Sequence, residues 1–351
     1  MRPRVLCGVL AAVALSVTAC GGGGDGSTGK SAKGGGSGFP VTVTDCGGAE
    51  TTFDGPPGKI VTSNASSLEM LMWLGAGDKV VGTGFPPGKG TMPEQFAGKA
   101  AKVPVLGRTV IGKERLLGSG ADLYIDSFAS MDMMGGAGEG PRPEEFEAAG
   151  IKHMFLHSTA CAAQRDKPLT DLSGVEEDIT ELGRVTGTSR RAAELVTGMR
   201  KKTAAVRKAL ADVPEAKRPS YFFFDYDAGT KQPVAVCNRQ VANAVITQAG
   251  ARNVFADCDG DFKPAGWEDV VAKNPDWIQL GVRNRGSEAA NDKAFDEAAD
   301  FLRSYGPTKG LKAVKEGRFL RVGSEATTIG GVRSADTVRE IAHTLYPDRV
   351  K

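Results

Sequence analysis

The sequence predicts an α/β protein with two Rossmann-like α/β lobes joined by a single long helix, and a ligand cleft between the lobes. Three observations predict this fold class. Short apolar runs alternate with helical stretches in two series, over residues 59–157 and 220–345, and one long helical pattern lies between them. A short motif also recurs in both series. Because strands that alternate with helices form parallel βαβ units, each series predicts one sheet covered on both faces.

A hairpin precedes the first series of alternating strands and helices. Alternating residues around Cys46-Gly47-Gly48 predict the hairpin over residues 41–53. Ser66 is the expected N-cap of the first helix, which Gly75 ends. Strands are expected over residues 59–63, 80–83, 103–106, 123–127 and 152–157, and helices over residues 66–74, 113–117 and 143–149.

One long helix is expected between the two series, over residues 189–212. Thr188 or Ser189 is its expected N-cap. Gly198 is its only interior glycine and Pro214 lies beyond its end, so the sequence contains no cause for a sharp bend. We therefore expect a stiff spine and a cleft that closes only slightly on binding. The positions that recur at steps of three and four are Ala192, Leu195, Val196, Met199, Thr203, Val206 and Leu210.

The second series echoes the first. Glu114 opens a short helix and Asp122, eight residues later, enters a strand, and Glu268 and Asp276 have the same relation. This repeat predicts that the two lobes are pseudo-symmetric. The segments of the second series are residues 220–225, 241–249, 267–272, 277–280, 295–304, 318–322 and 335–345.

The N-terminus has the features of an export signal. Arg2 and Arg4 precede an apolar run over residues 5–19, which is shorter than the roughly 20 residues that a membrane span needs. Small residues stand directly before Cys20, as in a lipobox. The resemblance to bacterial lipoproteins implies cleavage before Cys20, a lipid on its sulfur, and a place on the extracytoplasmic face of the cell membrane. An ordinary signal peptide followed by a chance cysteine is the alternative.

Composition limits the kinds of partner and indicates how the chain is divided. The signal peptide, residues 1–19, contains two of the 44 basic side chains, so 42 remain against 42 acidic ones, which argues against nucleic acid as a partner. We expect a monomer. The expected parts are a flexible Gly/Ser-rich tether over residues 20–39, an N-terminal lobe over 40–172, an inter-lobe helical region over 173–213 and a C-terminal lobe over 214–351.

Four cysteines remain when Cys7 of the signal and Cys20 are set aside. An even number in an exported chain predicts two disulfides, for which three pairings exist. We favour the pairing that keeps each disulfide within one lobe. This pairing joins Cys46 to Cys161 and Cys237 to Cys258.

Several segments occur in the order and spacing of a known family. They include Pro57-Gly58-Lys59-Ile60-Val61, residues 68–82, residues 249–255 and residues 268–276. Together they resemble the class III (cluster A-II) periplasmic binding proteins for siderophores, haem and cobalamin, over roughly residues 41–347. The resemblance implies a non-enzymatic solute-binding component of an ABC importer, with a permease and its ATPase as partners. One departure is Gly120-Ala121, where the family usually has a proline before Asp122.

The carboxyl ends of the strands locate the expected ligand site, because ligands of open α/β sheets bind beyond these ends. Arginines there would bind carboxylate, catecholate or hydroxamate oxygens, and aromatic rings would pack against the apolar body of a ligand. The resemblance implies Phe85, Arg108 and Arg239 as ligand contacts. A surface role on a loop is the alternative for any single arginine. The candidates are Asn64, Phe85, Arg108, Ser127, Phe128, Tyr226, Asn238, Arg239, Trp267, Arg283, Arg285 and Arg333.

The same candidates favour a ferric siderophore as the ligand. Arginines outnumber tryptophans, whereas the resemblance implies tryptophans for cobalamin, and Trp267 is the only tryptophan expected near the cleft. Tyr226 leaves haem as a further alternative. A siderophore chelates the iron itself, so we expect no cofactor and no metal ligand from the protein.

Glu114 and Glu268 are the expected contacts with the permease. The resemblance implies that a glutamate at each position docks onto permease arginines. Both stand in the first turn of a helix, where the helix dipole favours a carboxylate, so a purely structural role is the alternative. Glu69 is expected to pack within the lobe.

Other classes of protein fit less well. A zinc-importer binding protein would need about three histidines and a carboxylate around one ion. His153 and His157, on one expected strand, and His343 are not expected to converge. The sequence patterns of serine hydrolases, phosphate loops and dinucleotide sites are absent. A purely adhesive lipoprotein is the remaining alternative.

Overall fold

The computed structural model describes residues 38–128 and 140–351. The expected signal peptide, Cys20 and nearly all of the expected tether lie outside the described residues. The described residues belong to one compact unit that contains both lobes. None of the described helices is both long and apolar enough to cross a membrane.

The first lobe is built on a four-stranded parallel sheet in the order β4-β3-β5-β6. Leu123 and Ile125 of β5 enter the main core, while Tyr124 between them enters a second cluster on the opposite face. Both faces of this sheet are therefore covered, as expected for parallel strands. The strands are β3 Ile60–Thr62, β4 Val80–Thr83, β5 Leu123–Asp126 and β6 Lys152–Phe155.

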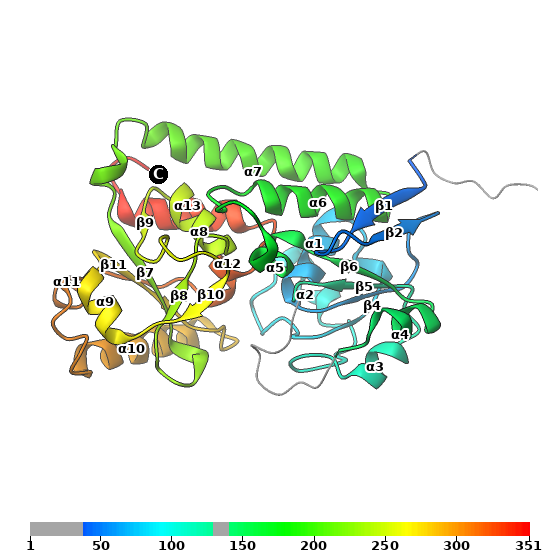
Figure 1. Cartoon of the computed structure of the whole chain (residues 1–351), viewed down its shortest axis with the longest axis horizontal. Helices are drawn as coiled ribbons and strands as arrows, with labels where there is room; N and C mark the ends of the chain where they lie inside the picture. The colour runs from blue at the N-terminus through cyan, green and yellow to red at the C-terminus, as the bar shows by residue number, and fades with distance from the viewer. Residues whose placement is uncertain (1–37, 129–139) are drawn as a thin grey trace, which may run out of the picture. The chain divides into compact units, whose positions relative to one another are not determined.

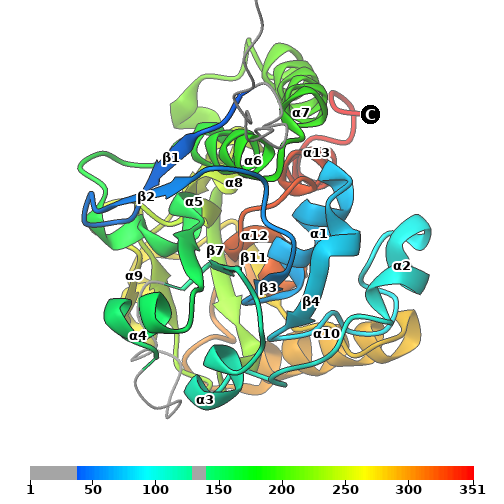
Figure 2. The same ribbon diagram turned by 90° about the vertical axis from the view of Figure 1, so that its right-hand side faces the viewer.

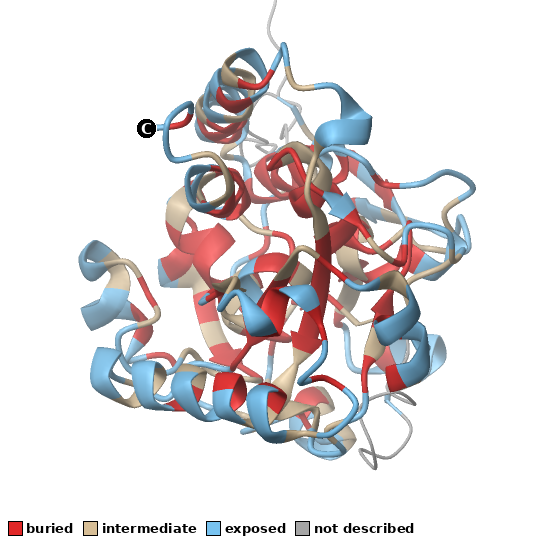
Figure 3. Cartoon of the chain, turned by 90° about the vertical axis from the view of Figure 1, so that its left-hand side faces the viewer, coloured by how far each residue is buried: buried red, intermediate tan, exposed pale blue. Residues whose placement is uncertain are grey.

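The second lobe repeats this plan. Its parallel sheet has the order β12-β11-β7-β9. When the strands of each sheet are numbered by their order in the chain, both sheets have the order 2-1-3-4. Figure 3 shows the strands at the centre of this lobe buried and the outward faces of its helices exposed. The strands are β7 Ser220–Asp225, β9 Arg252–Asn253, β11 Trp277–Gly281 and β12 Phe319–Leu320.

Two aspartates hold equivalent positions in the two sheets. Asp122, before β5, accepts hydrogen bonds from the backbone N–H groups of Gly58 (2.7 Å) and Lys59 (3.0 Å), before β3. Asp276, before β11, accepts from the backbone N–H and the hydroxyl of Ser220 at the start of β7, both at 2.8 Å. Burial alone would raise the pKa of Asp276, but hydrogen bonds from Lys312 and Ser220 outweigh it and lower this pKa to about 2. The repeated motif in the sequence thus marks repeated structure.

The helix α7, Ser189–Ala209, forms the expected spine. It packs against α6, Ser173–Thr186, and against α13, Ser334–Leu345, of the second lobe (Figures 1 and 2). Thr188 is the N-cap, and the helix ends slightly before the expected position 212. Its buried face joins a hydrophobic cluster that contains residues of both lobes.

Two antiparallel hairpins and two disulfides complete the fold. The expected hairpin pairs β1, Val41–Thr44, with β2, Glu50–Phe53. A second hairpin, not foreseen in the sequence, pairs β8, Val234–Val236, with β10, Phe262–Pro264. The structure contains the favoured cysteine pairing, which joins Cys46 to Cys161 and Cys237 to Cys258.

The lobes touch closely at Gly330, between α12 and α13. A Cβ atom on this residue would lie 2.6 Å from Ser158 Oγ and 2.9 Å from Val175 Cγ2, so only glycine fits there. The Ser66 hydroxyl donates a hydrogen bond to the Gly330 carbonyl oxygen at 2.8 Å. We call this meeting of Gly330 with Ser158, Val175 and Ser66 the inter-lobe contact.

Several expected element boundaries are wrong for local reasons. Helix α1 begins at Ala65, because Asn64 rather than Ser66 is the N-cap. Residues 103–106 do not form a strand, since only one bridge pairs Val105 with Thr83. Strand β6 ends at Phe155, and His157 begins a helix instead of continuing the strand.

The remaining helices cover the sheets and edges of the two lobes. Helix α10 begins well before the expected residue 295, because the Ser287 hydroxyl caps it by accepting from the backbone N–H of Ala290. These helices are α1 Ala65–Leu74, α2 Glu94–Ala100, α3 Lys113–Leu117, α4 Pro143–Ala148, α5 His157–Ala160, α8 Val241–Gln248, α9 Trp267–Lys273, α10 Glu288–Ser304, α11 Lys312–Lys315 and α12 Ser324–Thr328.

Candidate functional site

A large cavity lies between the lobes, with a volume of about 1710 Å³. Drug-sized ligands occupy pockets of roughly 300–1,000 Å³, so this cavity suits a larger ligand. Its walls come from segments that follow strands of both sheets, as expected for open α/β sheets. These segments lie after β3, β4 and β5 in the first lobe and after β7, β11 and β12 in the second.

Seven of the twelve predicted ligand contacts line this cavity. Five come from the first lobe and two from the second, and they converge from positions far apart in the sequence. They are Asn64, Phe85, Arg108, Ser127, Phe128, Arg283 and Arg333.

The wall formed by the first lobe contains two buried neutral donors. Asn64 follows β3 and is 2% exposed, and Ser127 follows β5 and is 1% exposed. The Nδ2 atom of Asn64 and the hydroxyl of Ser127 are buried and have no hydrogen-bond partner among the described residues. Buried polar atoms are nearly always paired, so these two donors require an explanation.

Two aromatic rings stand at the same edge of the first sheet. Phe85 follows β4 and Phe128 follows β5, and their ring centroids are 5.7 Å apart. Phe85 has φ of +31°, a conformation that costs a residue with a Cβ atom about 1–3 kcal/mol. Strained residues of this kind concentrate at ligand sites.

The wall formed by the second lobe carries carboxylates. Burial raises the pKa of Asp225, at the end of β7, and of Glu325, in α12, above their ordinary values. Asp227 accepts a hydrogen bond from the backbone N–H of Arg283 at 2.7 Å. It also forms an ion pair with Arg285, with 2.5 Å between Oδ1 and Nη2. Arg285 is thereby occupied within its own lobe, and it is absent from the cavity wall, contrary to the prediction.

Asp261 adds a further carboxylate to this wall. It lies between Cys258 and β10, and its Oδ1 atom is buried without a hydrogen-bond partner among the described residues. Burial raises its pKa to about 6. A cationic group of a ligand, or a proton, would relieve this buried charge.

The arginines of the cavity differ in their availability. Arg333 donates from Nε and Nη2 to the two carboxylate oxygens of Glu69, each at 2.7 Å, and from Nη2 to the Thr91 carbonyl oxygen at 2.9 Å. It therefore joins the lobes, and Glu69 is its partner. Arg108 is exposed at the cavity wall and has no ion pair among the residues that the structure covers.

Two predicted aromatic contacts lie inside the second lobe instead. Trp267 is 4% exposed and packs against Phe224 and Tyr305, with ring centroids 5.2 and 5.6 Å away. Tyr226 packs against Phe224 and Phe301. Neither lines the cavity, because each ring packs into the aromatic cluster that Phe224 and Phe301 form inside the lobe.

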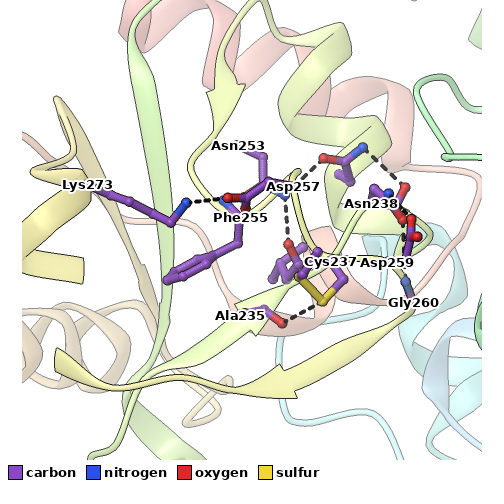
Figure 4. The surroundings of a disulfide bond; sticks show 12 residues. Ala235, Cys237, Asn238, Asn253, Phe255, Asp257, Asp259, Gly260 and Lys273 are labelled. Atoms are coloured by element: carbon purple, nitrogen blue, oxygen red, sulfur yellow. Dashed lines mark hydrogen bonds and ion pairs between the residues drawn. A yellow bond between two sulfur atoms is a disulfide. The ribbon is translucent and has the colours of Figure 1, made fainter. Parts of the chain in front are cut away.

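Asn238 and Arg239 also fall outside the cavity wall. The amide of Asn238 donates to the Asp259 carboxylate at 2.7 Å, beside the disulfide between Cys237 and Cys258 (Figure 4). Arg239 donates to the Ala163 carbonyl oxygen of the first lobe at 3.3 Å. Both residues organise the turn around the disulfide and its contact with the first lobe.

Comparison with known sequences decides the family. The sequence profile of a family described as periplasmic binding protein matches residues 60–326. The chain belongs to the periplasmic binding protein family. It is therefore a solute-binding protein of the kind that serves ABC importers, and not an enzyme.

Individual relatives of this periplasmic binding protein are distant. An uncharacterised ABC transporter substrate-binding lipoprotein, YvrC of Bacillus subtilis, is 25% identical over 314 residues, which cover 89% of this chain and 88% of the relative. A cobalamin-binding protein of Halobacterium salinarum is 25% identical over 250 residues, or 70% of this chain and 59% of the relative. A crystal structure from an ABC-type Fe3+-hydroxamate transport system of Saccharomonospora viridis is 27% identical, with a TM-score of 0.70 over 87% of this chain and 99% of the other.

The predicted docking glutamates of this binding protein occupy equivalent places in the two lobes. Glu114 is exposed in the first turn of α3, and Glu268 is exposed in the first turn of α9. Each helix leads into the third strand of its sheet. The pseudo-symmetry thus presents one carboxylate from each lobe.

The three histidines lie in separate places. His153 approaches Asp126 at 3.3 Å, His157 approaches the Thr44 carbonyl oxygen at 2.7 Å, and His343 lies 2.6 Å from the Val350 carbonyl oxygen. No group of three potential metal ligands forms among the described residues.

Sequence reasoning missed most of the carboxylates in the cavity. Asp225 ends the apolar run of β7, so strand periodicity marked this position, but Tyr226 was the predicted contact. Asp261 and Glu325 come from a hairpin and a short helix that no periodic pattern signalled. Glu69 finds its partner Arg333 across 264 positions of sequence, a contact that only the folded chain reveals.

Proposed function

We propose that this protein is the extracytoplasmic component of an ABC importer that captures a ferric siderophore and delivers it to a membrane permease. The observation that carries the proposal is the cavity of about 1710 Å³ between two α/β lobes, with Arg108 and Arg283 on its walls. Guanidinium groups bind the oxygen atoms of hydroxamates and catecholates. The likeness to the Fe3+-hydroxamate structure supports the same ligand class.

Cobalamin is the second candidate, because one relative is a cobalamin-binding protein. Against it, the cavity wall contains no tryptophan among the described residues. Haem has less support now that Tyr226 lies outside the cavity wall. In the zinc-importer alternative three histidines would meet, and the histidines here have separate partners.

Calorimetric titration of the soluble part, residues 38–351, tests the ligand. The probes are a ferric trihydroxamate, a ferric tricatecholate, haem and cobalamin. Calorimetry is preferable to intrinsic fluorescence, because no tryptophan of the described residues lines the cavity. We expect submicromolar affinity for a ferric siderophore. Tight binding of cobalamin alone would overturn this ligand and leave the family unchanged.

The permease proposal rests on Glu114 and Glu268. Replacing both by alanine is expected to abolish uptake while the affinity for the siderophore stays within about twofold, because neither residue lines the cavity. Glu94 and Glu288 provide the matched control, since they are exposed glutamates in the first turns of α2 and α10. Equal loss of uptake in both double variants would contradict docking at α3 and α9.

The membrane anchor is proposed at Cys20. The relative in Bacillus subtilis is a lipoprotein, and the lipobox of this sequence supports the same processing. Cys20→Ala is expected to release the protein into the medium or leave it unprocessed. Membrane fractionation that finds the variant retained as fully as the wild type would contradict the anchor.

A further inference from the structure

The two unpaired donors of the first lobe point to a ligand group of defined chemistry. Asn64 and Ser127 occupy the carboxyl ends of two adjacent strands, β3 and β5, and both line the cavity. Their donor atoms are buried and have no partner among the described residues. Leaving such an atom unpaired costs about 1–3 kcal/mol, so the fold tolerates two such costs at one edge of one sheet.

The orientation of the Asn64 amide is fixed by its second role. Its Oδ1 atom accepts hydrogen bonds from the backbone N–H of Ser67 at 3.0 Å and from the Ser67 hydroxyl at 3.2 Å, and so caps α1. A flipped amide would place its N–H groups against the Ser67 N–H. The Nδ2 atom is therefore a donor that stays unpaired as long as α1 is capped.

The aromatic rings enclose this position. Strand β3 lies between β4 and β5, and Phe85 and Phe128 follow those two flanking strands. Because adjacent strands are about 4.8 Å apart, rings from β4 and β5 with centroids 5.7 Å apart meet across the end of β3, where Asn64 lies.

We propose that Asn64 and Ser127 form an oxygen subsite that receives an uncharged acceptor oxygen of the ligand, such as an amide or hydroxamate carbonyl, between Phe85 and Phe128. This deepens the proposed function and rests on it. The donors are neutral and buried, so a full negative charge placed there would lose its hydration without a counter-charge. Charged oxygens are served instead by Arg108 and Arg283.

Such a subsite distinguishes between ligands by whether its two buried donors find a hydrogen-bond acceptor. A ligand with an acceptor oxygen at this point satisfies two buried donors, while an apolar group of equal size leaves both unpaired. Sites of this kind reject the wrong ligand more strongly than apolar pockets do. The subsite would therefore set specificity, and the arginines would attract any anionic complex.

Two substitutions of Asn64 test the donor without removing the cap. Serine and aspartate both cap helices well, but neither presents an N–H group at this position. With the probe that binds the wild type most tightly, among a ferric trihydroxamate, a ferric tricatecholate, haem and cobalamin, Asn64→Ser is expected to weaken binding about tenfold. At pH 8, Asn64→Asp is expected to weaken it about a hundredfold, because its carboxylate repels the ligand oxygen. Ser127→Ala is expected to weaken it about fivefold.

A control separates binding from stability. Tyr346→Phe removes a hydrogen bond to the Gly250 carbonyl oxygen, between two residues that do not line the cavity, and is expected to lower the midpoint of thermal unfolding while leaving the affinity unchanged. Wild-type affinity in all three cleft variants would overturn the subsite and leave the proposed function intact. Weaker binding by Asn64→Asp alone would show charge repulsion only and would also overturn it. A wild type that binds none of the four probes would overturn the proposed function together with the subsite.

Discussion

The two lobes share one scaffold and present different chemistry to the ligand. Both sheets have the order 2-1-3-4, and in both an aspartate before the third strand binds the backbone at the start of the first. At the cleft, however, the first lobe offers two buried neutral donors, two phenyl rings and Arg108, and the second offers Asp225, Asp261 and Glu325 together with Arg283. The strand order thus fixes where a ligand binds, while the residues just beyond each strand set the chemistry of each wall independently.

This difference gives the ligand an orientation. An uncharged acceptor oxygen fits the buried donors of the first lobe, anionic oxygens fit Arg108 and Arg283, and a group with positive charge or N–H donors fits the carboxylates of the second lobe. Four features allow the difference between the lobes to be tested. They are the two disulfides, the ion pair between Arg333 and Glu69, the buried carboxylate of Asp261 and the strained backbone of Phe85.

The disulfides are expected to give the largest difference between the lobes. The bond of the first lobe, between Cys46 and Cys161, spans 115 positions, and that of the second, between Cys237 and Cys258, spans 21. Loop-closure entropy then predicts losses of about 5 kcal/mol and about 3 kcal/mol for the respective double alanine variants. Urea denaturation measures both. Equal losses, or a larger loss for the second lobe, would show that the local turn matters more than loop length.

Removing Arg333 tests the joint between the lobes. Glu69 is 8% exposed, and Arg333→Ala leaves its carboxylate buried with the Trp73 indole N–H as its remaining partner. We expect a loss of about 2–3 kcal/mol in the free energy of unfolding, below the full cost of an uncompensated buried charge because Arg333 itself is half-exposed. Adding Glu69→Gln should recover part of the loss. Additive losses in the double variant would show that the two side chains act separately.

The buried carboxylate of Asp261, in the wall formed by the second lobe, is expected to make stability depend on pH. Burial raises its pKa from the ordinary value of 3.8 to about 6 in the folded protein, so the folded state binds the proton more tightly. The contribution of Asp261 to stability therefore falls as the pH rises from about 4 to about 6. We expect Asp261→Asn to match the wild type at pH 4 and to exceed it by about 1–2 kcal/mol at pH 7.5. Asp348→Asn, on the exposed surface, serves as the control and should show no such trend.

Substitutions of Phe85, in the wall formed by the first lobe, are expected to show the smallest difference in stability. Glycine adopts a positive φ without strain, whereas alanine retains the strain and also loses the ring. We expect Phe85→Gly to be more stable than Phe85→Ala by about 1 kcal/mol, the reverse of the usual order, and both to bind the ligand more weakly. Urea denaturation and calorimetry measure the two effects. The usual order, with alanine more stable, would rule out strain at this residue.

Most of the scaffold was predictable from the sequence because its signals are local. The bounds of β4, α3 and β7 agree with the expected residues, since each is an apolar run set off by turn residues or a helix start. The repeat of Glu114 and Asp122 by Glu268 and Asp276 marked the pseudo-symmetry for the same reason. Asn64, Phe85 and Ser127 were found because they directly follow strands.

The rest of the site depends on contacts that the sequence pattern does not encode. Tyr226 follows β7 and Trp267 begins α9, so the pattern placed both near the cleft. Their rings instead pack against Phe224 and Phe301 inside the second lobe. Arg333 was a predicted ligand contact, and its pairing with Glu69 requires the two lobes to be assembled. Asp261 reaches the cavity through a hairpin whose short strands lack a clear alternation.

The inter-lobe contact has a mechanical consequence. Gly330 meets Ser158 and Val175 without space for even one methyl group, so a rotation of one lobe against the other would have this contact as its fulcrum. Displacement about a fulcrum grows with the length of the lever arm. Figures 1 and 2 both place α3, which carries Glu114, well away from α12 beside this fulcrum, while α9, which carries Glu268, belongs to the same lobe as Gly330. A small rotation about Gly330 would therefore change the spacing between Glu114 and Glu268, and the proposed docking to a permease would report loading through this distance.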